Sequence, residues 1–221
     1  MSSPSLGSRP DTTAKRPRPT VRASRPLAAY RTVDLVTAAM LGVGLGVVFW
    51  AWDLLYTAPS NALGAVFAPL TGLLGAPWLL AGVVGGLMVR RPGAALVTEL
   101  VAASVEALIG NQWGWTTVIS GGLQGLGVEV ALALFLWRRF GVGVALLAGG
   151  LAAGFEVVFY EWHAYVADWT WSWKLAYLGF FALSGAVVAG LGGLAIVRAL
   201  ARTGAVRSMP PGQEELERTA H

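Results

Sequence analysis

Long apolar stretches alternate with short groups of basic residues along most of the sequence. A helix needs roughly 20 residues to cross the hydrocarbon core of a bilayer. Six stretches reach or approach that length, and they cover residues 33–56, 61–89, 93–110, 115–137, 142–163 and 173–200. This pattern predicts an all-α, polytopic membrane protein with six transmembrane helices.

The basic residues predict how these helices are oriented. Seven of the sixteen lysines and arginines lie in the first 31 residues, and most of the others gather at 90–91, 138–139 and 198–207. An even number of predicted crossings separates each group from the next, so all of the groups lie on one side of the membrane. Because cytoplasmic loops carry an excess of Lys and Arg, we expect both termini to be cytoplasmic (N-in/C-in). Lys174 is the exception to this arrangement.

The second stretch differs from the others because it contains Pro69 and Pro77. The part from Pro77 to Arg90 is short for a complete crossing. We therefore expect residues 57–75 to form a capping loop or half-helix on the outer face, with the crossing helix starting near Pro77. Irregular backbone at membrane depth is tolerated where it is buried against protein or lines a cavity.

The regions outside the six stretches are polar. Residues 1–32 are rich in Ser, Pro and Arg and contain no apolar run, which predicts a disordered, basic cytoplasmic tail. Residues 203–221 mix acidic and basic side chains and are interpreted as a second cytoplasmic tail. The transmembrane domain accordingly spans residues 33–202.

The composition supports a membrane protein and excludes several kinds of chemistry. Apolar residues make up 55% of the chain and charged residues only 13%, against about 25% charged in typical soluble domains. With no cysteine and two histidines, neither a thiolate metal site nor a histidine cage within one chain is expected. The net charge of +4 does not indicate nucleic-acid binding, because the basic residues lie at the ends of the apolar stretches.

No nucleotide-hydrolysing or catalytic motif occurs in the sequence. The P-loop pattern G-x-x-x-x-G-K-[ST], the zinc-protease pattern H-E-x-x-H and the nucleophile elbow G-x-S-x-G are all missing. We therefore expect neither an enzyme nor a bound cofactor. A substrate-binding protein of the plasma membrane, driven by a partner or by an ion gradient, fits these observations better.

Small residues recur every fourth position within the apolar stretches. The clearest row is Ala38, Gly42 and Gly46 near the inner half of the first predicted helix. Small residues at this spacing let helix backbones approach closely. Packing within the bundle explains most such rows, but this first row is also a candidate surface for docking a partner membrane subunit.

Four glutamates lie inside the predicted helices: Glu99, Glu106, Glu129 and Glu156. Together they would cost roughly 10–14 kcal/mol as charged groups at mid-bilayer. They must therefore be protonated, face a wet cavity or await a cation. For Glu99 and Glu129, the sequence favours a structural role as a protonated or hydrogen-bonded side chain. Glu106 and Glu156 lie in the outer half of the membrane, where a ligand-binding role is favoured.

The tryptophans concentrate at the outer ends of the predicted helices. Eight of the ten map there: Trp50, Trp52, Trp113, Trp115, Trp162, Trp169, Trp171 and Trp173. An interfacial belt would place tryptophans at both faces, so a belt alone does not explain this distribution. Aromatic rings near carboxylates suit a flat, cationic ligand. Glu156, Tyr160 and His163 fall at i, i+4 and i+7, on one predicted helix face that reaches the outer end.

The segment from Arg91 to Gly114, RPGAALVTELVAASVEALIGNQWG, resembles the signature region of the YkoE family. Members of this family are substrate-binding (S) components of energy-coupling-factor (ECF) vitamin transporters. The resemblance implies a six-helix S component that binds thiamine or its hydroxymethylpyrimidine precursor from outside. It also implies docking onto a transmembrane coupling subunit that two cytoplasmic ATPases drive. In the wider class this contact uses an A-x-x-x-A row, and Ala38 and Gly42 occupy the matching positions here.

Combined with this resemblance, the residues predict a binding site at the outer face. Glu106 and Glu156 are assigned the acidic roles, and Gln112 is an additional amide partner. Trp50, Trp113, Tyr160 and Trp162 would form aromatic walls, with residues 57–75 as a lid. His163 and Glu99 complete the candidate set.

Two other functions remain open from the sequence. A proton- or cation-coupled secondary transporter would use Glu99 and Glu129 as carriers and would work without partner subunits. A membrane scaffold without a small ligand is the third possibility, which the acidic residues within the helices argue against. The sequence does not distinguish thiamine from its pyrimidine precursor.

Overall fold

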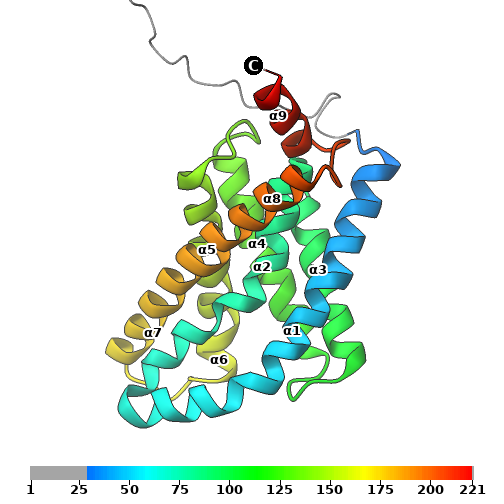
Figure 1. The fold of residues 1–221 in the computed structure, drawn as a ribbon. Coiled ribbons are helices and arrows are strands. Elements are labelled where there is room, and N and C mark those ends of the chain that lie inside the picture. The colour runs from blue at the N-terminus through cyan, green and yellow to red at the C-terminus, as the bar shows by residue number, and fades with distance from the viewer. Residues whose placement is uncertain (1–28, 221) are drawn as a thin grey trace, which may run out of the picture.

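The computed structural model describes residues 29–220, and these residues form helices joined by short turns (Figure 1). The α-helices are α1 (Thr32–Phe67), α2 (Leu80–Val89), α3 (Ala94–Ile109), α4 (Thr116–Leu134), α5 (Val142–Glu156), α6 (Trp162–Ala164), α7 (Trp171–Ser184), α8 (Gly192–Thr203) and α9 (Pro210–Thr219). Between them lie the 3-10 helices η1 (Ala68–Leu74) and η2 (Ala76–Leu79) and the π-helices η3 (Val157–Glu161) and η4 (Gly185–Leu191). No strand occurs within this range, so the predicted all-α class is confirmed.

Four helical stretches among the described residues are long and apolar enough to cross a membrane: Thr32–Val89, Thr116–Leu134, Val142–Ala164 and Trp171–Thr203. The first has 58 residues and contains α1, both 3-10 helices and α2. Helix α3 has 16 residues, which is short for a complete crossing on its own. These stretches identify a multi-pass membrane protein.

The boundary predicted between the first two spans is wrong. Residues 61–67 belong to α1, which continues through Pro59 instead of ending near residue 56. Proline lacks the N–H that would bond one turn back, which weakens the helix there without ending it. Figure 1 shows the last part of α1 turning across one end of the bundle before the chain returns through η1 and η2 into α2.

The two ends of the bundle differ in composition. Figure 1 shows the start of α1, the α2–α3 and α4–α5 turns and α9 at the upper end, which we call the basic end because it carries Arg31, Arg90, Arg91, Arg138, Arg139 and Arg202. The lower end holds the last part of α1, the α3–α4 turn and the α6–α7 turn. We call it the tryptophan end because it carries Trp113, Trp115, Trp162, Trp169 and Trp171.

The small-residue row on α1 packs inside the chain and not on its surface. Ala38, Gly42 and Gly46 are all buried, and Gly42 and Gly46 face α3. A Cβ atom on Gly42 would lie 2.8 Å from the carbonyl oxygen of Thr98, so a larger residue would push the two helices apart. The prediction that this row is a partner-docking surface is therefore corrected: α3 already occupies it.

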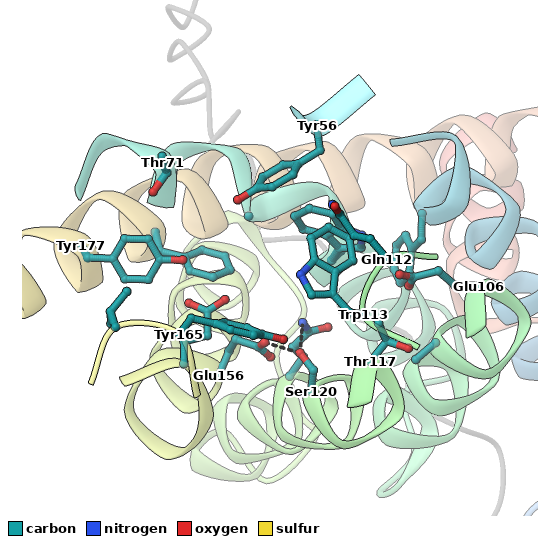
Figure 2. Close-up of a pocket in the computed structure, with 18 of the residues that line it drawn as sticks. Tyr56, Thr71, Glu106, Gln112, Trp113, Thr117, Ser120, Glu156, Tyr165 and Tyr177 are labelled. Carbon is teal, nitrogen blue, oxygen red and sulfur yellow. Dashed lines mark hydrogen bonds between the residues drawn. The ribbon is translucent and has the colours of Figure 1, made fainter. Parts of the chain in front are cut away.

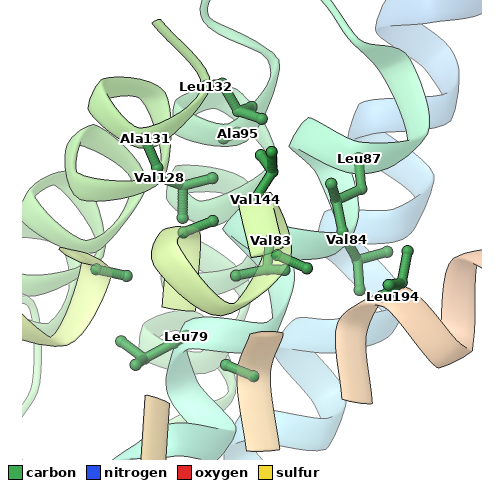
Figure 3. Close-up of a cluster of buried hydrophobic side chains, with 14 of the residues drawn as sticks. Leu79, Val83, Val84, Leu87, Ala95, Val128, Ala131, Leu132, Val144 and Leu194 are labelled. Atoms are coloured by element: carbon green, nitrogen blue, oxygen red, sulfur yellow. The ribbon is translucent and has the colours of Figure 1, made fainter. Parts of the chain in front are cut away.

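The central core lies where α2 passes between its neighbours. Helices η2, α2, α3, α4, α5 and α8 all contribute to it, with side chains that include Leu79, Val83, Val84, Leu87, Ala95, Val128, Leu132, Val144 and Leu194 (Figure 3). Close approach of α5 to η4 continues this core, because Gly149 packs against the backbone of Gly185 and Gly190. Without side chains at these positions, the two helices meet backbone to backbone.

Buried ion pairs hold the basic end together. The Arg91 guanidinium is fully buried, and its Nε donates to Asp34 Oδ2 over 2.8 Å. Arg31 also donates to Asp34, over 2.7 Å. Within the predicted C-terminal tail, α9 packs on the bundle, and its Glu214 accepts two hydrogen bonds from Arg90. The N-terminal tail predicted over 1–32 lies largely outside the described residues.

Candidate ligand-binding cavity

A cavity of about 290 Å³ opens among the helices near the tryptophan end (Figure 2). Its walls come from α1, the 3-10 helices, α3, α4, α5, η3 and α7 and from the α3–α4 and α6–α7 turns. The lining residues are Phe49, Tyr56, Thr71, Gly75, Trp78, Glu99, Ala103, Glu106, Gln112, Trp113, Thr117, Ser120, Gln124, Glu156, Glu161, Tyr165, Val166, Trp169, Tyr177 and Phe181. Its volume is near the lower end of the range of about 300–1,000 Å³ that is usual for small-molecule sites.

Helix α3 supplies two of the carboxyl groups because Glu99 and Glu106 lie two helical turns apart on one face. Glu99 is completely buried, and its Oε2 accepts a hydrogen bond from the backbone N–H of Gly82 on α2. Its Oε1 has no hydrogen-bond partner among the described residues. Glu106 Oε1 accepts from Asn111 Nδ2 over 3.2 Å.

The turn after α3 positions the next group of side chains. Asn111 Oδ1 accepts hydrogen bonds from the backbone N–H groups of Trp113 and Gly114, over 2.8 and 2.6 Å. An Asn side chain that bonds the backbone two or three residues ahead stabilises a tight turn. Gly114 has a φ of 62°, in the left-handed region that favours glycine. This turn directs Trp113 and Gln112 toward the cavity, as Figure 2 shows.

Three aromatic rings form one wall of the cavity. Tyr56, Trp78 and Trp113 contact one another edge to face, with ring centroids 5.1 Å (Tyr56–Trp78), 5.3 Å (Trp78–Trp113) and 5.6 Å (Tyr56–Trp113) apart. Edge-to-face packing is the favoured geometry of aromatic pairs. Asp53 holds Trp78 in place by accepting from its indole N–H over 2.9 Å. The wall therefore joins residues from α1, η2 and the α3–α4 turn.

The opposite side of the cavity carries the Glu156 carboxyl group. Its Oε1 accepts from Ser120 Oγ on α4, and Gln124 Nε2 donates to the same hydroxyl over 3.3 Å. Its other oxygen, Oε2, is buried without a hydrogen-bond partner among residues 29–220. Buried polar atoms are rarely left unpaired in native proteins. Glu99 and Glu156 thus each present an unpaired oxygen in the wall of one cavity.

A π-helical turn changes which residues of the fifth predicted helix line the cavity. Residues 157–161 form η3, whose hydrogen bonds run from i to i+5 instead of i to i+4. Glu156 and Glu161, five apart, both line the cavity, and Tyr160 and His163 do not. The predicted i, i+4, i+7 face of Glu156, Tyr160 and His163 is therefore wrong in its last two members.

The structure brings together five of the nine predicted ligand-binding residues: Glu99, Glu106, Gln112, Trp113 and Glu156. Trp50, Tyr160, Trp162 and His163 do not line the cavity. On α1, the buried residue that reaches it is Phe49, one position before Trp50. Trp162 instead packs edge to face on Trp171, with ring centroids 5.6 Å apart.

Several lining residues did not stand out in the sequence. Tyr56, Ser120, Gln124, Tyr165 and Tyr177 are separated along the chain and match no motif. Their only sequence signal is that each is a polar residue within or beside an apolar stretch. Partial burial raises the pKa of the Tyr165 hydroxyl, which lies in the α6–α7 turn.

The segment predicted as a lid borders the cavity. Thr71 and Gly75 line it from η1 and the turn after η1 (Figure 2). Two hydrogen bonds attach this segment to its neighbours: Ser184 Oγ donates to the Leu73 carbonyl over 2.6 Å, and Trp52 Nε1 donates to the Leu74 carbonyl over 3.1 Å. The two donors belong to α7 and α1, so the segment is attached to both helices.

The charges around the cavity are of one sign. Four glutamates line it, and none of the lysines or arginines in residues 29–220 does. Glu129, the fourth glutamate of the predicted spans, lies elsewhere: its Oε1 accepts from the Ala95 N–H over 2.8 Å, at the start of α3. A carboxylate at a helix N-terminus is stabilising. Glu99 and Glu129 therefore do not share one cavity.

An all-helical membrane bundle with an acidic, aromatic cavity defines a membrane substrate-binding protein. Comparison with known proteins identifies the family of the chain. Residues 33–155 match the family described as "ABC-type cobalt transport system, permease component". The chain is 32% identical over 191 residues to YkoE of Bacillus subtilis (strain 168), a candidate HMP/thiamine permease by its name, covering 84% of this chain and 92% of the relative. The chain belongs to this permease family, as a relative of YkoE.

A solved structure supports the same assignment. The chain matches the crystal structure of an S component of an ECF transporter with a TM-score of 0.79 and 28% identity, covering 87% of this chain and 96% of the other. The predicted resemblance to S components is therefore confirmed. Within residues 29–220, no group of three or more His, Cys, Asp or Glu side chains is arranged to hold a metal ion.

Proposed function

We propose that this chain is the substrate-binding subunit of an ECF-type importer and that it takes up thiamine or its hydroxymethylpyrimidine precursor. The observation that carries the proposal is the cavity, where unpaired carboxyl oxygens of Glu99 and Glu156 face aromatic walls without a basic side chain. Such a site suits a flat ring that carries positive charge or amino groups. The name of the relative YkoE supports the same class of ligand.

The residues suggest how such a ligand is held. Glu156 would accept from the exocyclic amine of the pyrimidine, because its Oε2 is free and Ser120 fixes its other oxygen. Trp113 and Tyr56 would pack against the rings. Glu106 would offset the positive charge of the thiazolium ring in thiamine. The pyrimidine precursor lacks that ring, so it would depend less on Glu106.

The same proposal includes a topology of six crossings with both termini in the cytoplasm. The basic end would then face the cytoplasm, in accordance with the excess of Lys and Arg in cytoplasmic loops. The cavity near the tryptophan end would open to the outside, and residues 57–75 would act as its lid.

Energy would come from partner subunits, because the sequence contains no P-loop. We infer that the chain docks onto a transmembrane coupling subunit driven by cytoplasmic ATPases, as its relationship to S components suggests. The row Ala38–Gly42–Gly46 is buried, and its two glycines pack against α3, so docking would use other surfaces of the bundle.

The first experiment is a titration of the purified chain with thiamine, hydroxymethylpyrimidine and, as an anionic aromatic control, nicotinate. Intrinsic tryptophan fluorescence is the readout, because Trp78, Trp113 and Trp169 line the cavity. Saturable quenching by one or both of the first two compounds, with no response to nicotinate, is expected. A flat response to all three from folded protein would contradict the proposal.

A second experiment separates the S component from an ion-coupled transporter. Uptake of labelled thiamine is measured in vesicles that contain this chain alone or together with the coupling subunit and ATPases. Uptake that requires ATP and the partners is expected. Concentrative uptake by the chain alone, driven by a proton gradient, would instead support secondary transport.

A further inference from the structure

A second groove lies at the basic end, on the opposite side of the core from the cavity. Its volume is about 650 Å³, and it lies between α8, α9 and the α4–α5 turn. The lining residues are Arg90, Phe140, Gly141, Leu194, Val197, Arg198, Ala201, Arg202, Pro211, Glu214, Glu215, Glu217 and Arg218. The proposed function gives this groove no role.

Four of the seven charged residues that line the groove form ion pairs, and the other three form none within the described residues. Arg90 pairs with Glu214, and Arg218 pairs with Glu215. Arg198 and Arg202 lie one turn apart on α8, both are exposed, and neither forms an ion pair within residues 29–220. Glu217 is the remaining acidic residue of the groove. The balance of unpaired charge is therefore positive, with the two arginines side by side.

The floor of the groove is apolar. Phe140, Leu194 and Val197 are buried hydrophobic residues that line it. Toward the middle of the bundle, the same helical stretch exposes Val187, Val188 and Leu191. Apolar side chains exposed on a membrane-spanning helix contact lipid tails. An apolar surface thus leads from the lipid-facing side of the bundle to the two arginines.

We propose that this groove binds an anionic phospholipid, with its phosphate between Arg198 and Arg202. Guanidinium groups bind phosphate oxygens through charge-assisted hydrogen bonds. One acyl chain would lie along Leu191 and Val188. A lipid fits better than a free phosphate because the groove joins a positive rim to an apolar surface, and basic pockets at the cytoplasmic ends of transmembrane helices are known to take lipid headgroups.

Native mass spectrometry of the detergent-purified full chain tests this proposal. The chain is titrated with phosphatidylglycerol and, separately, with zwitterionic phosphatidylcholine of the same acyl composition. We expect the chain to bind phosphatidylglycerol more tightly than phosphatidylcholine. In the variant Arg198→Gln/Arg202→Gln, the affinity for phosphatidylglycerol should decrease by about 25-fold, because each arginine contributes roughly fivefold. The matched control Arg138→Gln/Arg139→Gln removes two exposed arginines of the same end that do not line the groove, and we expect it to change the affinity less than twofold.

A third variant gives a change in the opposite direction. Glu217→Gln removes the opposing negative charge and is expected to tighten phosphatidylglycerol binding by up to about fivefold. Equal losses in both arginine variants, or equal binding of both lipids, would overturn the proposal. Displacement of phosphatidylglycerol by millimolar inorganic phosphate would also overturn it, because the site would then recognise free phosphate. Retained tryptophan fluorescence and a single size-exclusion peak verify that each variant is folded.

Discussion

The two ends of the bundle bury charged side chains in opposite ways. At the basic end, the buried Arg91 and Asp34 neutralise each other over 2.8 Å, and Arg31 adds a second donor. At the tryptophan end, the cavity holds carboxyl groups without a basic partner, and Glu99 and Glu156 each keep one oxygen unpaired. Buried ionisable groups are thus ion-paired at the basic end, whereas at the cavity they keep oxygens without a hydrogen-bond partner in the described part of the chain.

This difference separates structural charges from ligand-binding ones. A buried pair that satisfies itself needs nothing from outside, and breaking it costs stability. A buried carboxyl group with a free oxygen beside a cavity can gain a bond only from a ligand or water. We therefore expect substitutions at the basic end to change stability, and substitutions at the cavity to change ligand affinity.

The largest effect is expected at the basic end, from Asp34→Asn. This nearly isosteric change removes the carboxylate that Arg31 and Arg91 share. Removing one partner of a buried ion pair typically costs about 3–5 kcal/mol. We expect a decrease of that size in the free energy of unfolding, measured by denaturant titration in detergent micelles.

The control for this change is Asp168→Asn, because Asp168 is exposed in the α6–α7 turn and forms no ion pair within the described residues. Its effect is expected to stay within about 0.5 kcal/mol. Equal stability of the two variants would show that the buried pair is not needed for folding.

The next largest effect is expected at the cavity, from Glu156→Gln. The amide keeps the shape of the side chain but removes the charge that would accept from the ligand amine. Hydrogen bonds to charged groups contribute about 1.5–3 kcal/mol, so thiamine affinity should fall by roughly 10- to 100-fold. Fluorescence titration measures the loss.

Glu129→Gln serves as the matched change outside the cavity. Its carboxyl group accepts from backbone N–H groups at the start of α3, so we expect thiamine affinity to stay within twofold. If both glutamate variants lost affinity equally, the cavity would not be the binding site.

A smaller effect on affinity is expected from Trp113→Ala. This change removes one ring of the aromatic wall, and aromatic pairs contribute about 0.5–1.5 kcal/mol beyond area burial. Thiamine affinity should fall by about fivefold, measured by isothermal calorimetry to avoid the loss of a fluorophore. Trp115→Ala, two residues away and exposed, should leave affinity unchanged. Similar losses in both would indicate a distorted turn instead of a lost wall.

The smallest effect is expected from His163→Gln. The sequence pattern assigned His163 to the binding face, but the structure leaves it exposed and away from the cavity lining. Thiamine affinity should stay within twofold in the titration that reveals the Glu156→Gln loss. A tenfold decrease would favour the assignment made from helical periodicity over the one made from the cavity.

Helical regularity decided which site residues could be predicted from the sequence. Helix α3 is regular, so the spacing of seven between Glu99 and Glu106 placed both on one face, and both line the cavity. Helix α5 instead continues into η3, where one π-helical turn places Glu161 in the site in place of Tyr160. A single additional residue in a turn has no clear signature in the sequence.

The partners of the buried charged residues also could not be predicted from the sequence. Arg90 and Arg91 were interpreted as part of the cytoplasmic basic surface, and both lie at the basic end. Their side chains are nevertheless buried, because Arg91 contacts Asp34 and Arg90 contacts Glu214 of α9. The partners are separated from them by 57 and 124 positions, so charge counting within a local window could not identify them.

The sequence by itself determined that this is a helical, multi-pass membrane protein with acidic and aromatic chemistry and with the family relationship that Arg91–Gly114 indicated. These properties depend on composition and on the length of apolar runs, which bilayer thickness constrains directly. Only the tertiary structure decided which faces meet. It packs Gly42 and Gly46 of α1 against α3, and it brings Tyr56, Ser120 and Tyr177 together with the glutamates around one cavity. The physical reason is that helix packing depends on close contact between segments far apart in the chain, and in lipid no hydrophobic pattern marks those contacts in advance.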